Sequence, residues 1–100
     1  MIDFPALQKS VYQNKINHQF NVTDVPLEFS LMYGEVAEAF EAWRKRKDDV
    51  GEELADVLIY LMGLAEILGV DLEAELLRKM EINEQRKYVR EEGVLKRVDG

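Results

Sequence analysis

The segment from residue 50 to residue 68 constrains the fold more than any other part of the chain, because as a helix it is apolar around nearly its whole circumference. One stripe of other residues interrupts the apolar surface, and it consists of Glu53, Asp56, Tyr60 and Gly63. A helix that is apolar on almost every side lies at the centre of its bundle. Three further short helices can hardly cover it all round, so we expect a second copy of the chain to cover the rest.

The remaining sequence predicts three more helices and contains no repeat. Apolar residues at near-helical spacing place these helices at about residues 5 to 20, 26 to 45 and 72 to 88. Pro26 suits the first turn of the second helix, Gly69 ends the third, and Asp71 is the expected N-cap of the fourth. The fold class that follows is all-α, with four helices in each subunit of an oligomeric helical bundle.

Two acidic pairs lie on the predicted second and third helices. They are Glu35-x-x-Glu38 and Glu53-x-x-Asp56, and the i, i+3 spacing places each pair on one helix face. Asp56 lies inside an apolar run, where a carboxylate is costly unless a positive charge neutralises it, and no Lys or Arg occurs between Lys47 and Arg78. If the two helices pack antiparallel through the short connection near residues 47 to 50, four carboxylates converge. Such a set of hard oxygen ligands suits Mg²⁺ or Mn²⁺.

The predicted fourth helix carries hydrogen-bond donors on its apolar face. Lys79, Asn83 and Arg86 fall at i, i+4 and i+7, so the face becomes cationic toward its C-terminal end. These groups can donate to phosphate oxygens opposite a carboxylate-bound metal. Ion pairing of Asp56 with Lys79 or Arg86 is the competing interpretation. Tyr60, one turn after Asp56, is either a core tyrosine or a further phosphate donor.

Composition limits the partners and the compartment. We expect residues 1–100 to form a single domain, with a core at about 5–88 and a C-terminal tail at 89–100 whose structure the sequence leaves open. The net charge of −7 repels nucleic acids and anionic membranes, so a polyphosphate substrate would have to arrive with its metal. The chain has no cysteine, no stretch long enough to span a membrane and no basic start typical of a signal peptide. We therefore expect a soluble cytoplasmic protein.

Three stretches of the sequence together resemble a known family. They read Gly34-Glu35-Val36-Ala37-Glu38, then after 14 residues Glu53-Leu54-Ala55-Asp56-Val57-Leu58-Ile59-Tyr60, and later Lys79-Met80-Glu81-Ile82-Asn83-Glu84-Gln85-Arg86-Lys87-Tyr88. The combination resembles the MazG-like all-α nucleoside triphosphate pyrophosphohydrolases over roughly residues 27 to 88, and the dCTP pyrophosphatase branch most of all. The resemblance implies a four-helix subunit that forms a dimer or tetramer and hydrolyses (d)NTP to (d)NMP and pyrophosphate with Mg²⁺.

The resemblance also implies roles for individual residues. The metal ligands would be Glu35, Glu38, Glu53 and Asp56, and the residues in contact with the substrate phosphates would be Tyr60, Lys79, Asn83 and Arg86. Glu35 or Glu38 would be the catalytic base that takes a proton from the attacking water. The biological purpose implied by the family is house-cleaning of nucleotide pools.

Two departures from the family pattern keep other functions open. Gly34 stands where many members carry a second acid, and the first helix lacks the tryptophan that contacts the base in the dCTP pyrophosphatase branch. A phosphoribosyl-ATP pyrophosphohydrolase or a dUTPase-like enzyme would use the same acids on another substrate. A non-catalytic helical interaction module, in which the acids pair with Lys79 and Arg86, is the alternative from a different class.

Overall fold

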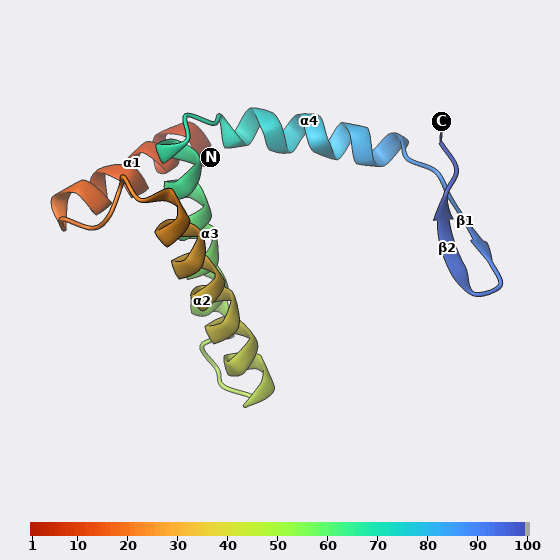
Figure 1. The fold of residues 1–100 in the computed structure, drawn as a ribbon, viewed down its shortest axis with the longest axis horizontal. Helices are drawn as coiled ribbons and strands as arrows, with labels where there is room; N and C mark the ends of the chain where they lie inside the picture. Colours follow the sequence, from red (N-terminus) through yellow and green to blue (C-terminus); the bar gives the residue numbers. More distant parts are fainter. Residues whose placement is uncertain (100) are drawn as a thin grey trace.

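The computed structural model describes residues 1–99 and consists of four helices followed by a β-hairpin (Figure 1). The elements, in chain order, are α1 (Phe4–Asn17), α2 (Val25–Arg44), α3 (Val50–Ile67), α4 (Leu72–Gln85), β1 (Tyr88–Glu91) and β2 (Val94–Arg97). The predicted number and order of helices are confirmed. Among the described residues no helix is long and apolar enough to cross a membrane.

Aspartate side chains begin three of the helices. The carboxylates of Asp3, Asp24 and Asp71 each accept a hydrogen bond of 3.1 Å from the backbone N–H three residues later. The predicted cap at Asp71 is therefore confirmed. The helix α3 stops two residues before Gly69, the residue expected to end it. Gly69 has a φ of 70°, a left-handed conformation that favours glycine. The N–H of Val70 then donates to the carbonyl of Ala65 at 2.8 Å.

The helices α2 and α3 form an antiparallel pair, joined by residues 45 to 49, and α1 packs across the C-terminal half of α3 (Figure 1). The buried apolar residues all lie on α2 and α3, and they are Ala39, Ala42, Met62, Leu64 and Ala65. Much of the rest of α3 stays uncovered in the single chain, with Leu54 58% and Leu58 47% exposed. One chain therefore does not cover the apolar circumference of α3, which is the premise on which the expected oligomer rests.

The helix α4 extends away from the α2–α3 pair as an arm (Figure 1). Its start is held near α1, because the side-chain amide of Gln8 donates to the Val70 carbonyl at 2.8 Å and to the Glu66 carboxylate at 3.0 Å. No residue of α4 is buried, and its apolar residues Leu77 and Met80 are 60% and 57% exposed. Within one chain the arm has almost no packing partner.

The C-terminal segment differs from the prediction. The fourth helix stops at Gln85 instead of reaching residue 88, and the tail forms an antiparallel hairpin in which Tyr88 faces Arg97 and Glu91 faces Val94. The turn consists of Glu92 and Gly93 at φ values of 51° and 78°, the conformation that two-residue hairpin turns require. The hairpin thus gives a structure to the tail, to which the sequence alone assigned none.

Candidate active site

The antiparallel packing of α2 and α3 brings three of the four predicted carboxylates together. Glu35 and Glu38 from α2 and Glu53 from α3 each offer one carboxylate oxygen, and these oxygens all lie within 4.8 Å of one another. Glu35 and Glu53 are half-buried and Glu38 is exposed. We call these three residues the acidic cluster. Its position between two helices is the one that the i, i+3 spacing predicted.

The acidic cluster carries a negative charge that Lys47 offsets only in part. No ion pair to Glu35, Glu38, Glu53 or Asp56 exists within residues 1–99. Burial raises the pKa of Glu35, and the nearby charges of Glu38, Asp56 and Glu53 raise it further. Burial likewise raises the pKa of Glu53, followed by Glu38, Asp49 and Asp56. The cluster therefore holds negative charge at a cost that a cation would remove.

Asp56 differs from the expectation in one respect. It is exposed, although its neighbours in sequence are apolar, because its own chain does not cover the leucines on either side of it. Its carboxylate is not among the three within 4.8 Å of one another, but its charge reaches both Glu35 and Glu53. Asp56 thus stands at the edge of the acidic cluster, on the open face of α3.

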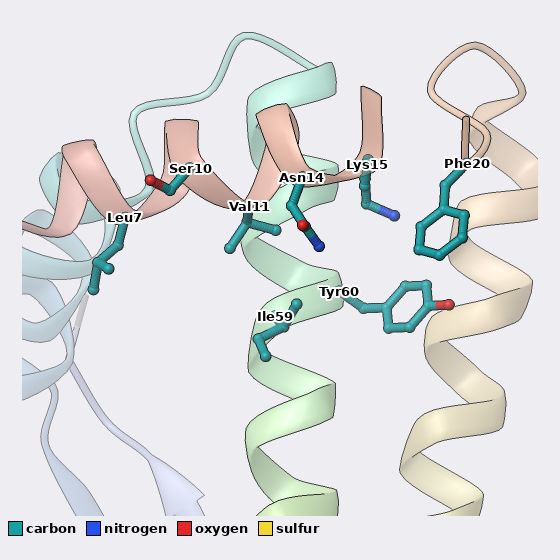
Figure 2. Close-up of a pocket in the computed structure, with 8 residues that line it drawn as sticks. All are labelled: Leu7, Ser10, Val11, Asn14, Lys15, Phe20, Ile59 and Tyr60. Carbon is teal, nitrogen blue, oxygen red and sulfur yellow. The ribbon is translucent and has the colours of Figure 1, made fainter. Parts of the chain in front are cut away.

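Tyr60 lies beside the acidic cluster and also lines a cavity. Burial raises the pKa of its hydroxyl, followed by the negative charges of Glu35 and Glu28. Figure 2 shows the cavity between α1 and α3, which has a volume of about 320 Å³. Its walls are mostly apolar, and they are formed by Leu7, Ser10, Val11, Asn14, Lys15, Phe20, Ile59 and Tyr60.

The predicted phosphate-binding residues of α4 do not meet the acidic cluster within one chain. Lys79 and Asn83 are exposed on the arm, which points away from α2 and α3 (Figure 1). Arg86 caps the C-terminal end of α4 and is half-buried, and its Nε is buried without a hydrogen-bond partner among the described residues. The competing ion pair of Asp56 with Lys79 or Arg86 is likewise not formed within residues 1–99.

A comparison with family models decides the family. The model described as the MazG-like family matches residues 27–98, which is most of the chain and includes the acidic cluster, Tyr60 and the arm. The chain belongs to the MazG-like family. The predicted family is therefore confirmed.

Two relatives of this MazG-like chain are informative. The dCTP pyrophosphatase 1 of Rattus norvegicus is 42% identical over 64 residues, which cover 53% of this chain and 38% of that protein. This chain thus aligns with less than half the length of that relative. The solved structure of a cyanophage S-2L MazG-like pyrophosphohydrolase, bound to dGDP and three catalytic Mn²⁺ ions per active site, matches with a TM-score of 0.70. The match covers 99% of this chain and 100% of that chain at 24% identity, and it confirms the predicted fold class.

The acidic cluster of this MazG-like chain fits a divalent cation. The Oε2 atoms of Glu35 and Glu53 are buried and have no hydrogen-bond partner among residues 1–99. Buried polar atoms rarely lack a partner, and each one needs an explanation. Carboxylate oxygens are the ligands that Mg²⁺ and Mn²⁺ prefer. Glu35, Glu38 and Glu53, with Asp56 at the edge, are the residues that would hold the metal.

Sequence reasoning missed a buried ion pair next to the cavity. Lys15 of α1 and Glu28 of α2 pair with each other, and only 7% and 2% of their surfaces are exposed. One indication was available in the sequence. Leu7, Val11 and Lys15 follow one another at i, i+4 and i+8, so the lysine continues the apolar face of the first helix. Nothing in the sequence indicates that Glu28 is its partner.

Proposed function

We propose that this MazG-like protein is a nucleoside triphosphate pyrophosphohydrolase that converts (d)NTP to (d)NMP and pyrophosphate with Mg²⁺ as its cofactor. The observation that carries the proposal is the convergence of Glu35, Glu38 and Glu53, none of which has an ion-pair partner within residues 1–99. The names of the two relatives support the reaction, and the dGDP and Mn²⁺ bound by the cyanophage protein support a nucleotide substrate and a divalent metal.

The carboxylates have distinct roles in this proposal. Glu35, Glu38, Glu53 and Asp56 are the proposed metal ligands. Bound Mg²⁺ or Mn²⁺ supplies charge neutralisation of the triphosphate and a water of lowered pKa. Glu35 or Glu38 takes the proton of the attacking water.

The phosphate-binding residues come, in this proposal, from a second copy of the chain. Lys79, Asn83 and Arg86 lie on an arm that points away from the cluster of their own chain (Figure 1). The cluster is negative and has no ion-pair partner within residues 1–99, whereas this face of the arm is cationic and its Arg86 Nε has no hydrogen-bond partner there. A homo-oligomer, either a dimer or a tetramer, would bring the two together and would also cover α3. The leaving pyrophosphate would then receive hydrogen bonds from the partner's arm.

The test is pyrophosphate release from a panel of nucleotides, with and without Mg²⁺. The panel contains the four common dNTPs, dUTP, the ribonucleotides and phosphoribosyl-ATP, so that it also decides between the proposed function and the related enzymes. We expect Mg²⁺-dependent release from at least one dNTP and its loss in Glu38→Gln. Exclusive release from phosphoribosyl-ATP or dUTP would favour those enzymes instead.

Metal binding gives a second measurement that does not need the substrate. A ligand bound only by the folded state raises the melting temperature, so the melting temperature should increase with millimolar Mg²⁺ or Mn²⁺. No release from any nucleotide together with no metal-dependent shift would favour a non-catalytic interaction module. The expected setting is the cytoplasm, where the enzyme would remove surplus or unwanted nucleotides.

A further inference from the structure

The buried pair of Lys15 and Glu28 links α1 to α2, and the lysine side chain also lies against α3. Lys15 comes from α1, and its ammonium group pairs with one carboxylate oxygen of Glu28 on α2. The other oxygen of Glu28 accepts a hydrogen bond of 3.3 Å from the amide of Asn21, in the connection between the two helices. The negative charge of Glu28 is thus neutralised and hydrogen-bonded inside the protein.

The lysine reaches its partner by passing over Gly63 of α3. A Cβ atom at Gly63 would lie 2.6 Å from the Cε of Lys15, closer than two non-bonded carbon atoms can approach. The other two glycines inside helices, Gly34 and Gly51, have no such neighbour within 4 Å. The absence of a side chain at residue 63 therefore serves the path of Lys15.

Tyr60 connects the buried pair to the acidic cluster. The Nζ of Lys15 lies 4.7 Å from the centre of the Tyr60 ring, within the range of a cation–π interaction. Figure 2 shows both side chains at the wall of the same cavity. The Tyr60 hydroxyl lies in the negative field of Glu35 and Glu28, which are seven residues apart and share one face of α2. Tyr60 thus lies between the pair and the cluster.

Stability alone is a weak explanation for such a pair. Removing two charges from water costs so much that an apolar pair of similar volume often stabilises a protein as well or better. A buried pair does, however, fix the geometry of its neighbours, because neither partner can move without leaving the other unpaired. One neighbour of this pair is the ring of Tyr60, which lies under the Lys15 ammonium group.

We propose that Lys15 and Glu28, seated against Gly63, are positioning residues that hold the Tyr60 ring in place between the cavity and the acidic cluster. This inference rests on the proposed function, together with the contact between Tyr60 and the substrate phosphates that the family resemblance implies. Lys15 and Glu28 act on the reaction only through Tyr60, and neither needs to touch the nucleotide.

The main test is a kinetic double-mutant cycle. The variant Lys15→Met with Glu28→Gln removes both charges together, so no buried charge is left unpaired and the protein folds. We expect kcat/KM for pyrophosphate release to fall at least tenfold, while the Mn²⁺ affinity stays within twofold of the wild type. The triple variant, which adds Tyr60→Leu to this pair variant, should have almost the same kcat/KM as Tyr60→Leu alone. The reason is that all three changes act through one group, the Tyr60 ring.

A single substitution at Gly63 tests the path of the lysine. Gly63→Ala displaces Lys15, and we expect the same direction of change in kcat/KM as in the pair variant. Gly51→Ala is the matched control on the same helix, since its new methyl group meets no atom within 4 Å, and it should keep the wild-type kinetics. Equal kinetics for Gly63→Ala and Gly51→Ala would overturn the positioning role.

The NMR signals of the Tyr60 ring give a readout that does not depend on hydrolysis. We expect these signals to shift in the pair variant, because the ring loses the ammonium group above it. Unchanged ring signals, or kinetic losses that simply add to that of Tyr60→Leu, would overturn the inference. A wild type that releases no pyrophosphate overturns the proposed function, and the ring signals then still decide whether the pair holds Tyr60.

Discussion

Glu35 is easier to protonate than an ordinary glutamate, since burial and three neighbouring carboxylates raise its pKa. The folded state therefore binds this proton more tightly than the unfolded state does. Where the folded pKa lies above the unfolded one, stability falls as the pH rises through the interval between the two values. Glu35 and Glu53 should therefore make the metal-free protein more stable in mildly acidic solution than at neutral pH.

The substitution Glu35→Gln tests this sign. Without metal at neutral pH we expect the variant to melt a few degrees above the wild type, because one repelling charge is lost. Glu41→Gln on the same helix is the matched control with the opposite sign, since a hydrogen bond from Arg44 lowers the pKa of Glu41. In saturating Mg²⁺ we expect the opposite order, with the wild type melting at a higher temperature than Glu35→Gln. A lower melting temperature for metal-free Glu35→Gln would contradict the account of the cluster.

The substitution Asp56→Asn tests the edge of the cluster. Although Asp56 is exposed, its charge acts on Glu35 and Glu53, so we expect the variant to lose pyrophosphate release and to bind Mg²⁺ more weakly. The helical circular dichroism signal of the variant should be unchanged, and its melting temperature should be equal to or higher than that of the wild type. Glu52→Gln removes the same charge from an adjacent turn and should leave the activity intact. Full activity of Asp56→Asn would remove this residue from the site.

At the residue scale the sequence predicted which carboxylates converge better than how deeply they are buried. The spacing places Glu35 and Glu38 on one face of α2, and the antiparallel packing brings Glu53 of α3 beside them. The predicted burial of Asp56 was wrong for the single chain, because hydrophobic neighbours bury a residue only if something covers them. The pairing of Lys15 with Glu28 depends on how α1 crosses α2 and α3, and that geometry is not encoded in local spacing.

The first turns of α2 and α3 differ in a way that mutation can measure. Asp24 accepts a capping hydrogen bond from the backbone of Leu27, whereas the side chain of Asp49 makes no cap bond at the start of α3. Asp24→Ala should therefore destabilise the protein by about 1 kcal/mol. Asp49→Ala should not destabilise the protein, because it removes no capping hydrogen bond and it also removes a charge that repels Glu53. Thermal unfolding followed by circular dichroism compares the two, and equal losses would show that the caps do not differ.

At the element scale the helices were predictable and the C-terminal segment was not. Apolar periodicity, Pro26 and Asp71 set the helix starts to within a residue or two of those observed. The first helix ends earlier than expected, at Asn17, because the chain turns at Gln19, which has a φ of 58° without being glycine. The hairpin has only Glu92-Gly93 as its local indication, and its strands are too short and too exposed for a clear alternating pattern.

The whole molecule should associate in solution. The uncovered faces of α3 and α4 expose Leu54, Leu58, Leu77 and Met80, so we expect light scattering at micromolar concentration to report a mass well above the 11.6 kDa of one chain. The melting temperature should rise with protein concentration. Leu58→Glu places a charge on this face and should shift the protein toward the monomer. A wild-type monomer at micromolar concentration would refute the assembly.

A mixing experiment tests whether the arm serves a second copy. Lys79→Ala should cost about 2 to 4 kcal/mol of transition-state stabilisation. When Lys79→Ala and Asp56→Asn chains are unfolded and refolded together, a mixed dimer contains one site with an intact cluster and an intact arm. Half of randomly formed dimers are mixed, so roughly a quarter of the sites should recover activity. Mixtures as inactive as either parent would mean that the arm does not act between chains.

The arm begins just after Gly69 and Val70, where hydrogen bonds hold the chain to α1 and α3, and its length amplifies small angular changes at that point. At 1.5 Å per residue the 14 residues of α4 are about 21 Å long. A rotation of ten degrees about the Gly69 backbone therefore moves the far end of the helix by roughly 4 Å, more than the length of a hydrogen bond. Gly69 has a φ of 70°, and a Cβ added to it would meet no atom within 4 Å beyond its chain neighbours. Small torsional changes at one glycine would thus decide how far apart two neighbouring copies hold their functional groups.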